Sequence, residues 1–453
     1  MTEYGAAELN LGITEKLAEY LVNLKYEDLP DAVAHECRRG VLDWLGCALA
    51  GSQHATIDRL TRVLQTMNST GAVTAFGRRV KLGMLEGPLA NGQMGHVLDY
   101  DDTHMDGVML HTSGPVLASM LALGESRGLN GKDLMVGYVA GFEAGVRVGQ
   151  GAPNHHDGGW HLTGTLGTIA AGAACGSLIG LDAQQMVYAF GIATTQAGGM
   201  QQNRGTMCKS FHAGKAASNG VLAALLAEGG FDSSNEILEG KKGFCRIYSG
   251  STNEDVILKG LGERYFISTN GYKPYACGVV LHPIIDTAIG LGQGSGIVPE
   301  NVKSIDIVGN PKAVSITGVA DPKTGLKSKF SIGHATAVGY IDGAAGIVQF
   351  SNERAVADDV VGLREKVNVS TDDALRADQS RGTVTSNSGQ RFDFATEHAT
   401  GTVDNPMSDA VIEAKFLANA EPTVGAARAG QIRDMVRNLD EVDDLGDLTA
   451  LCA

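Results

Sequence analysis

Hydrophobic residues recur at helical spacing over the first fifty residues of the chain. Three leucines between residues 17 and 24 predict an amphipathic helix that begins with Thr14 as its N-cap and ends before Pro30. A second helix is predicted over residues 31–50, where apolar residues again form one stripe. Both helices are expected to be structural.

From residue 115 to about residue 230 the sequence is dominated by Ala, Gly, Leu and Met, as in GYVAGFEAGVRVG and GTIAAGAACGSLIGLD. Helices that are apolar nearly all round are typical of a buried bundle, and small residues let helix axes approach closely. Polar residues interrupt these runs before any reaches the roughly 18 residues of a membrane span. We therefore predict tightly packed, buried helices.

The pattern changes after about residue 271. The segments VKSIDIVGN, EKVNVST, GTVTSN and RFDFATE alternate or are β-branched, and Ser388-Gly389 indicates a hairpin turn between the last two. Helical spacing returns in SDAVIEAKFLANA and AGQIRDMVRNLDEV. The predicted fold is mainly α with an α+β part: a helical domain over residues 1–270, completed by 397–453, and a smaller α+β domain over 271–396.

Composition narrows the choice of partner and compartment. A formal charge of −15 argues against nucleic acid or an anionic membrane surface as a partner, but a small anion could still bind in a locally positive pocket. The 7 cysteines have no CxxC spacing, which favours neither a disulfide framework nor a zinc site. The N-terminal MTEYGAAELNLG lacks a basic region followed by an apolar run, so we expect a cytoplasmic protein.

The stretch GHVLDYDDTHMDGVMLHTSG, residues 95–114, has the highest density of chemically active side chains. Its acidic and imidazole groups are His96, His104, His111, Asp99, Asp101, Asp102 and Asp106. On a helix, Asp99, Asp102 and Asp106 would share a face with Thr103, and neighbouring carboxylates shift one another's proton affinity. This density predicts an acid/base site, with an Asp-rich capping loop as the alternative.

Further motifs follow in order: LHTSG, GWHLTGTLG, CKSFHAGKAASNG, KPYACG, KFSIGHATAVGYIDG and NPMSDAVIEAKF. Together with LDYDDTH they make the sequence resemble the MmgE/PrpD family, which includes 2-methylcitrate dehydratase, cis-aconitate decarboxylase and iminodisuccinate epimerase. The resemblance covers nearly the whole chain. It implies a large helical domain with an α+β lid domain inserted before the last helices, and a homodimer.

The resemblance also implies the active-site residues Asp99, Thr103, His111, His161, Lys209 and Lys273. Lys209 precedes an Ala-rich segment that we expect to be helical, and a cation near a helix N-terminus indicates an external anion, with a surface lysine as the alternative. Lys273, at the start of the presumed lid, and Arg204 would add positive charge to the same pocket. For His161 the alternative is a core histidine.

Two further histidines are expected to contact substrate. His104 belongs to LDYDDTH, and His334 stands where some decarboxylases of the family have a tyrosine, in the motif that begins KFS. Some of them also have a histidine near Gly278, where this chain has His282 a few residues later. Both differences leave the substrate open.

The reactions known in the family share a step in which charge builds on a carbon next to a carboxylate. Lys209 and Lys273 would offset that charge by a few kcal/mol. We expect His111 to move the proton, Asp99 to orient His111 or tune its pKa, and Thr103 to hydrogen-bond the substrate.

The predicted function is a cofactor-independent lyase on a di- or tricarboxylate, similar to cis-aconitate decarboxylase or 2-methylcitrate dehydratase. An epimerase of a dicarboxylate such as iminodisuccinate and a non-catalytic polycarboxylate-binding protein are the alternatives. GLGQGSG at residues 290–296 has no Walker lysine, and His155-His156-Asp157 lacks a metal-ligand spacing. No cofactor and no metal are expected.

Overall fold

Helices make up most of the protein. The computed structural model describes residues 11–453, and 58% of it is helical, with 19 α-helices in that range. This confirms the prediction of a mainly α fold with an α+β part. The N-terminal segment MTEYGAAELNLG, on which the expectation of a cytoplasmic protein rests, lies largely outside the described residues.

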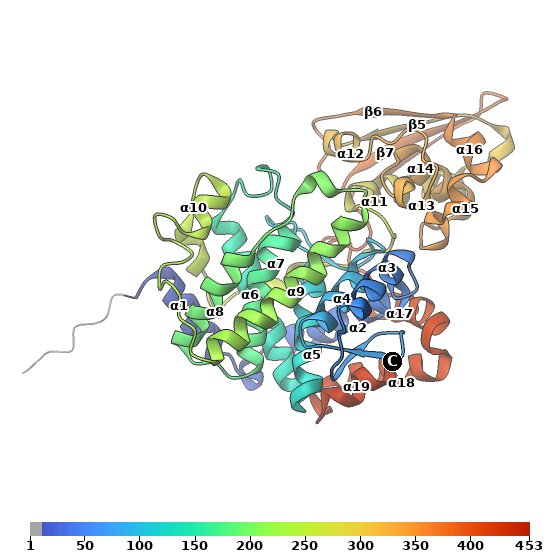
Figure 1. Cartoon of the computed structure of the whole chain (residues 1–453). Helices are drawn as coiled ribbons and strands as arrows, with labels where there is room; N and C mark the ends of the chain where they lie inside the picture. The colour runs from blue at the N-terminus through green and yellow to red at the C-terminus, as the bar shows by residue number, and fades with distance from the viewer. Residues whose placement is uncertain (1–10) are drawn as a thin grey trace, which may run out of the picture.

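The first half of the chain forms the helical part (Figure 1). Its helices are α1 (Ile13–Val22), α2 (Asp31–Gly51), α3 (Ala55–Thr66), α4 (Glu86–His96), α5 (Ser113–Arg127), α6 (Gly131–Gly151), α7 (Leu162–Leu178), α8 (Ala183–Gln196), α9 (Met207–Glu228) and α10 (Phe244–Ser249). Two short antiparallel pairs accompany them: β1 (Val73–Ala75) with β2 (Val80–Leu82), and β3 (Thr103–His104) with β4 (Asn270–Gly271).

The predicted buried bundle corresponds to α5 through α9. Helix α7 packs between α6 and α9, and small residues make this approach feasible. A Cβ added to Gly220 of α9 would lie 2.3 Å from the Cβ of Ala171 in α7, so the contact requires glycine.

The first helix starts slightly earlier than predicted. Gly12 is the N-cap of α1, and Thr14, the predicted cap, lies in the first turn with its hydroxyl on Glu239. Helix α2 agrees with its prediction to within one residue.

The α+β part contains a four-stranded sheet with the strand order β6-β5-β7-β8. Its strands are β5 (Val302–Gly309), β6 (Val367–Thr371), β7 (Ser380–Ser386) and β8 (Arg391–Thr396), and its helices are α11 (His282–Ser295), α12 (Pro311–Ile316), α13 (Gly325–Ser328), α14 (Ile332–Asp342), α15 (Asn352–Ala355) and α16 (Asp358–Arg364). Strand β5 is parallel to β6, and the β7–β8 hairpin turns through Gly389 at a φ of +89°. Both the strands and the predicted hairpin are therefore present.

The last three helices return to the helical part. They are α17 (Asp409–Val424), α18 (Ala426–Arg437) and α19 (Leu445–Leu451), and α17 packs along α2. Buried side chains of α17 to α19 join the core of the helical part, whereas the sheet and α11 to α16 enclose a second core. The domain boundaries at residues 271 and 396 remain a prediction.

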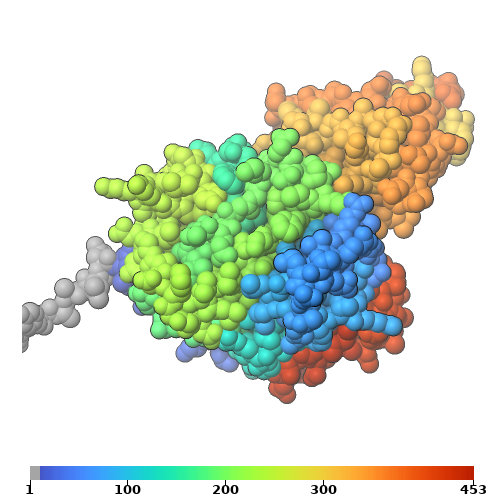
Figure 2. Space-filling model, in the orientation of Figure 1, coloured from blue at the N-terminus to red at the C-terminus, as the bar shows by residue number. Residues whose placement is uncertain are grey.

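The α+β part, orange in Figure 2, lies at one corner of the helical part. It adjoins segments of the helical part that are drawn in blue and in green. Over residues 11–453, no helix is both long and apolar enough to cross a membrane.

Candidate active site

The acidic stretch after α4 is an irregular loop and not the helix on which its carboxylates would share a face. Helix α4 ends at His96, and Asp99 follows at a φ of +53°, in the left-handed region that aspartate tolerates better than most residues. The loop then enters the short strand β3. Asp99, Asp102 and Asp106 consequently do not share a face, and each has a different set of partners.

Asp99 is the centre of a buried charge cluster. Its Oδ1 lies 2.6 Å from Nζ of Lys273 and 3.1 Å from Nζ of Lys209. Burial alone would raise the pKa of Asp99, but the two ammonium groups outweigh it and hold this pKa well below its usual range. Asp99 therefore anchors two lysines. It does not hydrogen-bond to His111, which corrects the prediction that it orients this ring, whereas its charge still acts on His111.

The two lysines reach Asp99 from distant parts of the chain. Lys209 lies in the first turn of α9, whose N-cap is Thr206, and Lys273 follows β4. Burial lowers the pKa of Lys209, whereas the closer contact with Asp99 outweighs burial for Lys273 and raises its pKa. Both ammonium groups are thus positioned beside one carboxylate.

Six of the predicted site residues line one cavity. Its lining includes Asp99, His111, His161, Arg204, Lys209 and Lys273, with Met109, Leu162, Val280, Ile316 and Phe330 among the apolar groups. Arg204 Nη2 lies 3.2 Å from Nε2 of His156, which also lines the cavity. Three cations therefore face one carboxylate, Asp99, along this lining.

His111 is held by one ring nitrogen. Its Nδ1 lies 2.9 Å from the carbonyl oxygen of Asp102, 3.0 Å from Oγ1 of Thr103 and 3.5 Å from a carboxylate oxygen of Asp101. Because a carbonyl oxygen only accepts, we assign the proton to Nδ1, which leaves Nε2 unprotonated in the neutral ring. Thr103 therefore holds His111 and does not line the cavity. This corrects the prediction that Thr103 hydrogen-bonds the substrate.

Three more histidines form a continuous row of rings that begins at His111. The ring centroid of His96 lies 4.6 Å from that of His111 and 5.7 Å from that of His161, and Nδ1 of His161 lies 2.9 Å from Nδ1 of His212. Burial lowers the pKa of His96 to about 4 and that of His161 well below its usual value. His96 and His161 are therefore neutral at neutral pH.

Sequence reasoning did not select His96, Asp101 or His212 for the site. Asp101 accepts from Nδ1 of His96 at 2.9 Å and lies beside His111. The signal was available, because His96 and Asp101 belong to the acidic stretch and His212 belongs to CKSFH. Spacing alone could not show that these side chains converge.

His104 and His334 do not line the cavity, which corrects their predicted contact with substrate. His104 places Nδ1 at 2.9 Å from the carbonyl oxygen of Val108 and Nε2 at 2.9 Å from Oγ1 of Thr269. His334 places Nε2 at 2.8 Å from the carbonyl oxygen of Gln349. Both rings take part in local packing.

His96, Asp101 and His111 could supply metal ligands, since one ligand atom from each lies within 4.8 Å of the others. These atoms already hydrogen-bond or contact one another, so an ion would have to replace those contacts. Sequence spacing did not indicate this cluster, and activity without metal remains a prediction.

Two family models match the chain. The MmgE/PrpD N-terminal domain matches residues 15–256, and the MmgE/PrpD C-terminal domain matches residues 275–441. The chain belongs to the MmgE/PrpD family. Asp99, His111 and Lys209 lie within the first match, Lys273 lies between the two, and Phe330 lies within the second.

Curated members of the MmgE/PrpD family are similar to this chain over nearly its whole length. Cis-aconitate decarboxylase of Aspergillus terreus is 26% identical, over 97% of this chain and 96% of its own length. The cis-aconitate decarboxylases of Mus musculus and Homo sapiens are each 25% identical over 97% of this chain, and 93% and 94% of their own lengths are covered.

Proposed function

We propose that this protein is a lyase that acts on a small di- or tricarboxylate by proton transfer at a carbon next to a carboxylate, most similar in reaction to cis-aconitate decarboxylase. The observation that carries the proposal is the common cavity of Lys209, Lys273, Arg204 and His111. The names of the family relatives support decarboxylation over the other reactions.

The charge of the cavity favours an anion with several carboxylates. Arg204, Lys209 and Lys273 carry three positive charges, and Asp99 supplies one negative charge among the cavity-lining residues. Lys209 also stands at the N-terminus of α9, where the helix dipole favours negative charge. A dianion or trianion would balance this excess in a partly buried site, where unbalanced charge is costly.

His111 has the geometry of the proton donor and acceptor. In a decarboxylation the bond between the carboxyl carbon and its neighbour breaks, CO₂ leaves, and the electron pair stays in an enolate-like system. Lys209 and Lys273 stabilise that charge. His111 first takes up a proton from solvent on Nε2 and then delivers this proton to carbon. In a dehydration or an epimerisation the same nitrogen would first take a proton from carbon.

A binding titration with cis-aconitate, 2-methylcitrate and iminodisuccinate, followed by NMR in D₂O, tests the proposal. We expect the decarboxylated product of cis-aconitate, with one deuterium on carbon. If the spectra show water loss or epimerisation, the reaction is a dehydration or an epimerisation and not a decarboxylation. Tight binding of all three acids without turnover or exchange would identify a binding protein, and a lack of binding would contradict the proposal altogether.

A further inference from the structure

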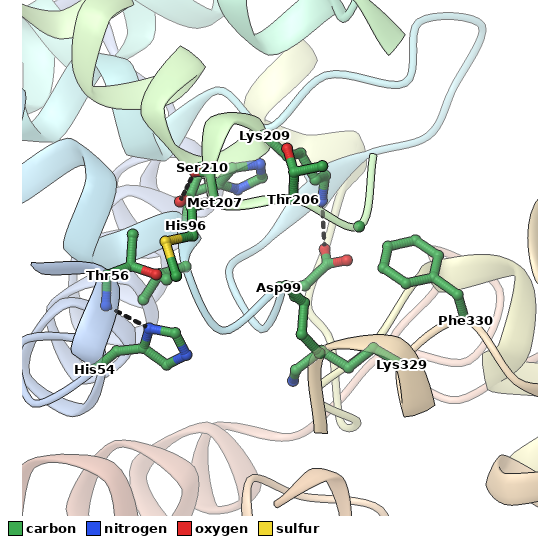
Figure 3. A pocket seen from close by; sticks show the side chains of 13 residues that line it. His54, Thr56, His96, Asp99, Thr206, Met207, Lys209, Ser210, Lys329 and Phe330 are labelled. Atoms are coloured by element: carbon green, nitrogen blue, oxygen red, sulfur yellow. Dashed lines mark hydrogen bonds and ion pairs between the residues drawn. The ribbon is translucent and has the colours of Figure 1, made fainter. Parts of the chain in front are cut away.

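A second cavity adjoins the candidate active site (Figure 3). Asp99, Lys209 and Phe330 line both cavities, so the two meet at the ion pair of Asp99 with Lys209. The remaining side chains of the second cavity include His54, Thr56, His96, Thr206, Met207, Ser210, Leu326 and Lys329. The lining thus combines the start of α3 and the start of α9 with α13 and the segment after it.

Thr56 presents a hydroxyl without a partner. The residue is 4% exposed, and its Oγ1 has no hydrogen bond within residues 11–453. Figure 3 shows this hydroxyl pointing toward the interior of the cavity. A buried hydroxyl left unpaired costs about 1–3 kcal/mol, which a ligand that accepts its proton would recover.

His54 offers a second donor. Its Nδ1 accepts a hydrogen bond from the backbone N–H of Thr56 at 3.1 Å. In the neutral ring the proton therefore resides on Nε2, which can donate.

Lys329 adds a buried cation. It is 6% exposed, and its Nζ donates to the carbonyl oxygen of Leu98 at 2.7 Å and to that of Ala276. Over the described residues it has no ion pair with a carboxylate within 4.0 Å. Burial lowers the pKa of Lys329 to about 8, so the group is still mostly charged at neutral pH. The same ammonium group lies 5.1 Å from the ring centroid of Phe350. A buried ammonium that contacts carbonyl oxygens and a ring but no paired carboxylate favours an anion beside it.

We propose that this second cavity is a carboxylate subsite, which takes the carboxylate of the substrate most distant from the reacting carbon through Thr56, His54 and Lys329. The inference rests on the proposed function and narrows it to substrates with three carboxylates. Two carboxylates would lie with Lys209, Lys273 and Arg204, and the third would lie beyond the Asp99–Lys209 pair.

Thr56→Val is the sharpest test, because its hydroxyl has no hydrogen bond to lose in the free protein. We expect thermal stability that is unchanged or higher, and a dissociation constant for cis-aconitate that is weaker by about 10-fold, the loss of one hydrogen bond to a charged group. Itaconate, which has two carboxylates, should bind Thr56→Val and the parent equally. Thr336→Val is the matched control, since its buried Oγ1 also lacks a partner within residues 11–453 but lines neither cavity.

Lys329→Met provides a second measurement. It should weaken cis-aconitate more than Thr56→Val does and reduce the salt dependence of binding, with itaconate again unaffected; circular dichroism would establish that it folds. If the variant does not fold, the Thr56 result decides. Equal loss for both acids, or no loss for either, would overturn the subsite and leave a water-filled cavity. Failure of the parent to bind either acid would instead contradict the proposed function.

Discussion

His111 faces the candidate active site with one nitrogen because the other is already engaged. The carbonyl oxygen of Asp102 and the hydroxyl of Thr103 hold Nδ1, and the Asp101 carboxylate lies nearby. A ring fixed in this way presents a defined tautomer, which a general acid or base requires. The hydrogen-bond partners of His111 are thus part of its proposed role.

We expect His111→Gln to lower turnover by about 10²- to 10⁴-fold, the usual contribution of a general acid or base, while substrate binding is retained. Deuterium incorporation into the product carbon should slow by a similar factor. Turnover by NMR and binding by calorimetry would measure the two effects. The exposed His35→Gln is the control. Near-normal turnover in His111→Gln would transfer the role to His161.

Lys209→Ala should weaken polycarboxylate binding by about 10- to 100-fold, because one charge-assisted contact is lost, and should reduce the salt dependence of the dissociation constant. Lys273 still pairs with Asp99 in this variant, so the fold should persist. Lys215→Ala removes the same charge from an exposed position of the same helix and should bind normally. Equal affinities of the two variants would show that Lys209 does not bind the anion.

The cluster of His96, Asp101 and His111 makes metal dependence a direct question. We expect dialysis against a chelator to leave turnover unchanged, because Nδ1 of His96 already hydrogen-bonds to Asp101 and Nδ1 of His111 is held by the acidic loop. The rate before and after dialysis, with metal content by mass spectrometry, is the measurement. Loss of activity that a single metal ion restores would contradict this expectation.

Among the elements, α17 secures the acidic loop from the far end of the chain. Nζ of Lys415 lies 2.7 Å from Oδ1 of Asp43 in α2 and 2.8 Å from the carbonyl oxygen of Tyr100, over whose ring it also packs at 4.0 Å. Lys415 is 8% exposed and Asp43 is 1% exposed. The return of α17 to the helical part therefore fixes the loop that carries Asp99.

Lys415→Met should lower the free energy of unfolding by about 3–5 kcal/mol, because it leaves Asp43 buried without its partner. Urea denaturation would measure the loss, and adding Asp43→Asn should recover part of it. Arg437→Met breaks an ion pair with Glu413 at a half-exposed position and should cost no more than about 1 kcal/mol. Similar losses for both single variants would contradict a special role for the buried pair.

At the scale of the whole molecule, several buried histidines set the response to acid. Burial lowers the pKa from 6.5 to about 3 for His282 and to about 4 for three others, which are His96, His155 and His334. The unfolded chain binds protons near pH 6.5 and the folded one does not. Stability from these groups is present above pH 6.5 and is lost as the pH falls toward 4.

We therefore expect the urea midpoint to fall between pH 7 and pH 5, with net proton uptake on unfolding at pH 5. Asp102 acts in the opposite direction, because burial raises its pKa to about 8 and its proton is released on unfolding. The four histidines together take up more protons on unfolding than this one carboxyl group releases. His155→Phe should reduce the pH dependence, since His155 packs against Trp160 and Tyr248. A midpoint that is constant or higher at pH 5 would contradict the expectation.

The sequence by itself determined the elements of this protein. Periodicity is a local property, so the spacing of apolar residues was sufficient for α2, the buried bundle, the strands of the sheet and the hairpin at Gly389. The motifs were also sufficient to select Asp99, His111, His161, Lys209 and Lys273, which the structure places along one cavity.

Only the tertiary structure decided what each selected residue contacts. Asp99 pairs with lysines 110 and 174 positions away, the difference between residue numbers 99, 209 and 273. Such contacts follow from the packing of α9 and β4 against one loop, and spacing along the chain contains no record of them. For the same reason the role of Thr103, the positions of His104 and His334, and the cavity behind the Asp99–Lys209 pair became visible only in the folded chain.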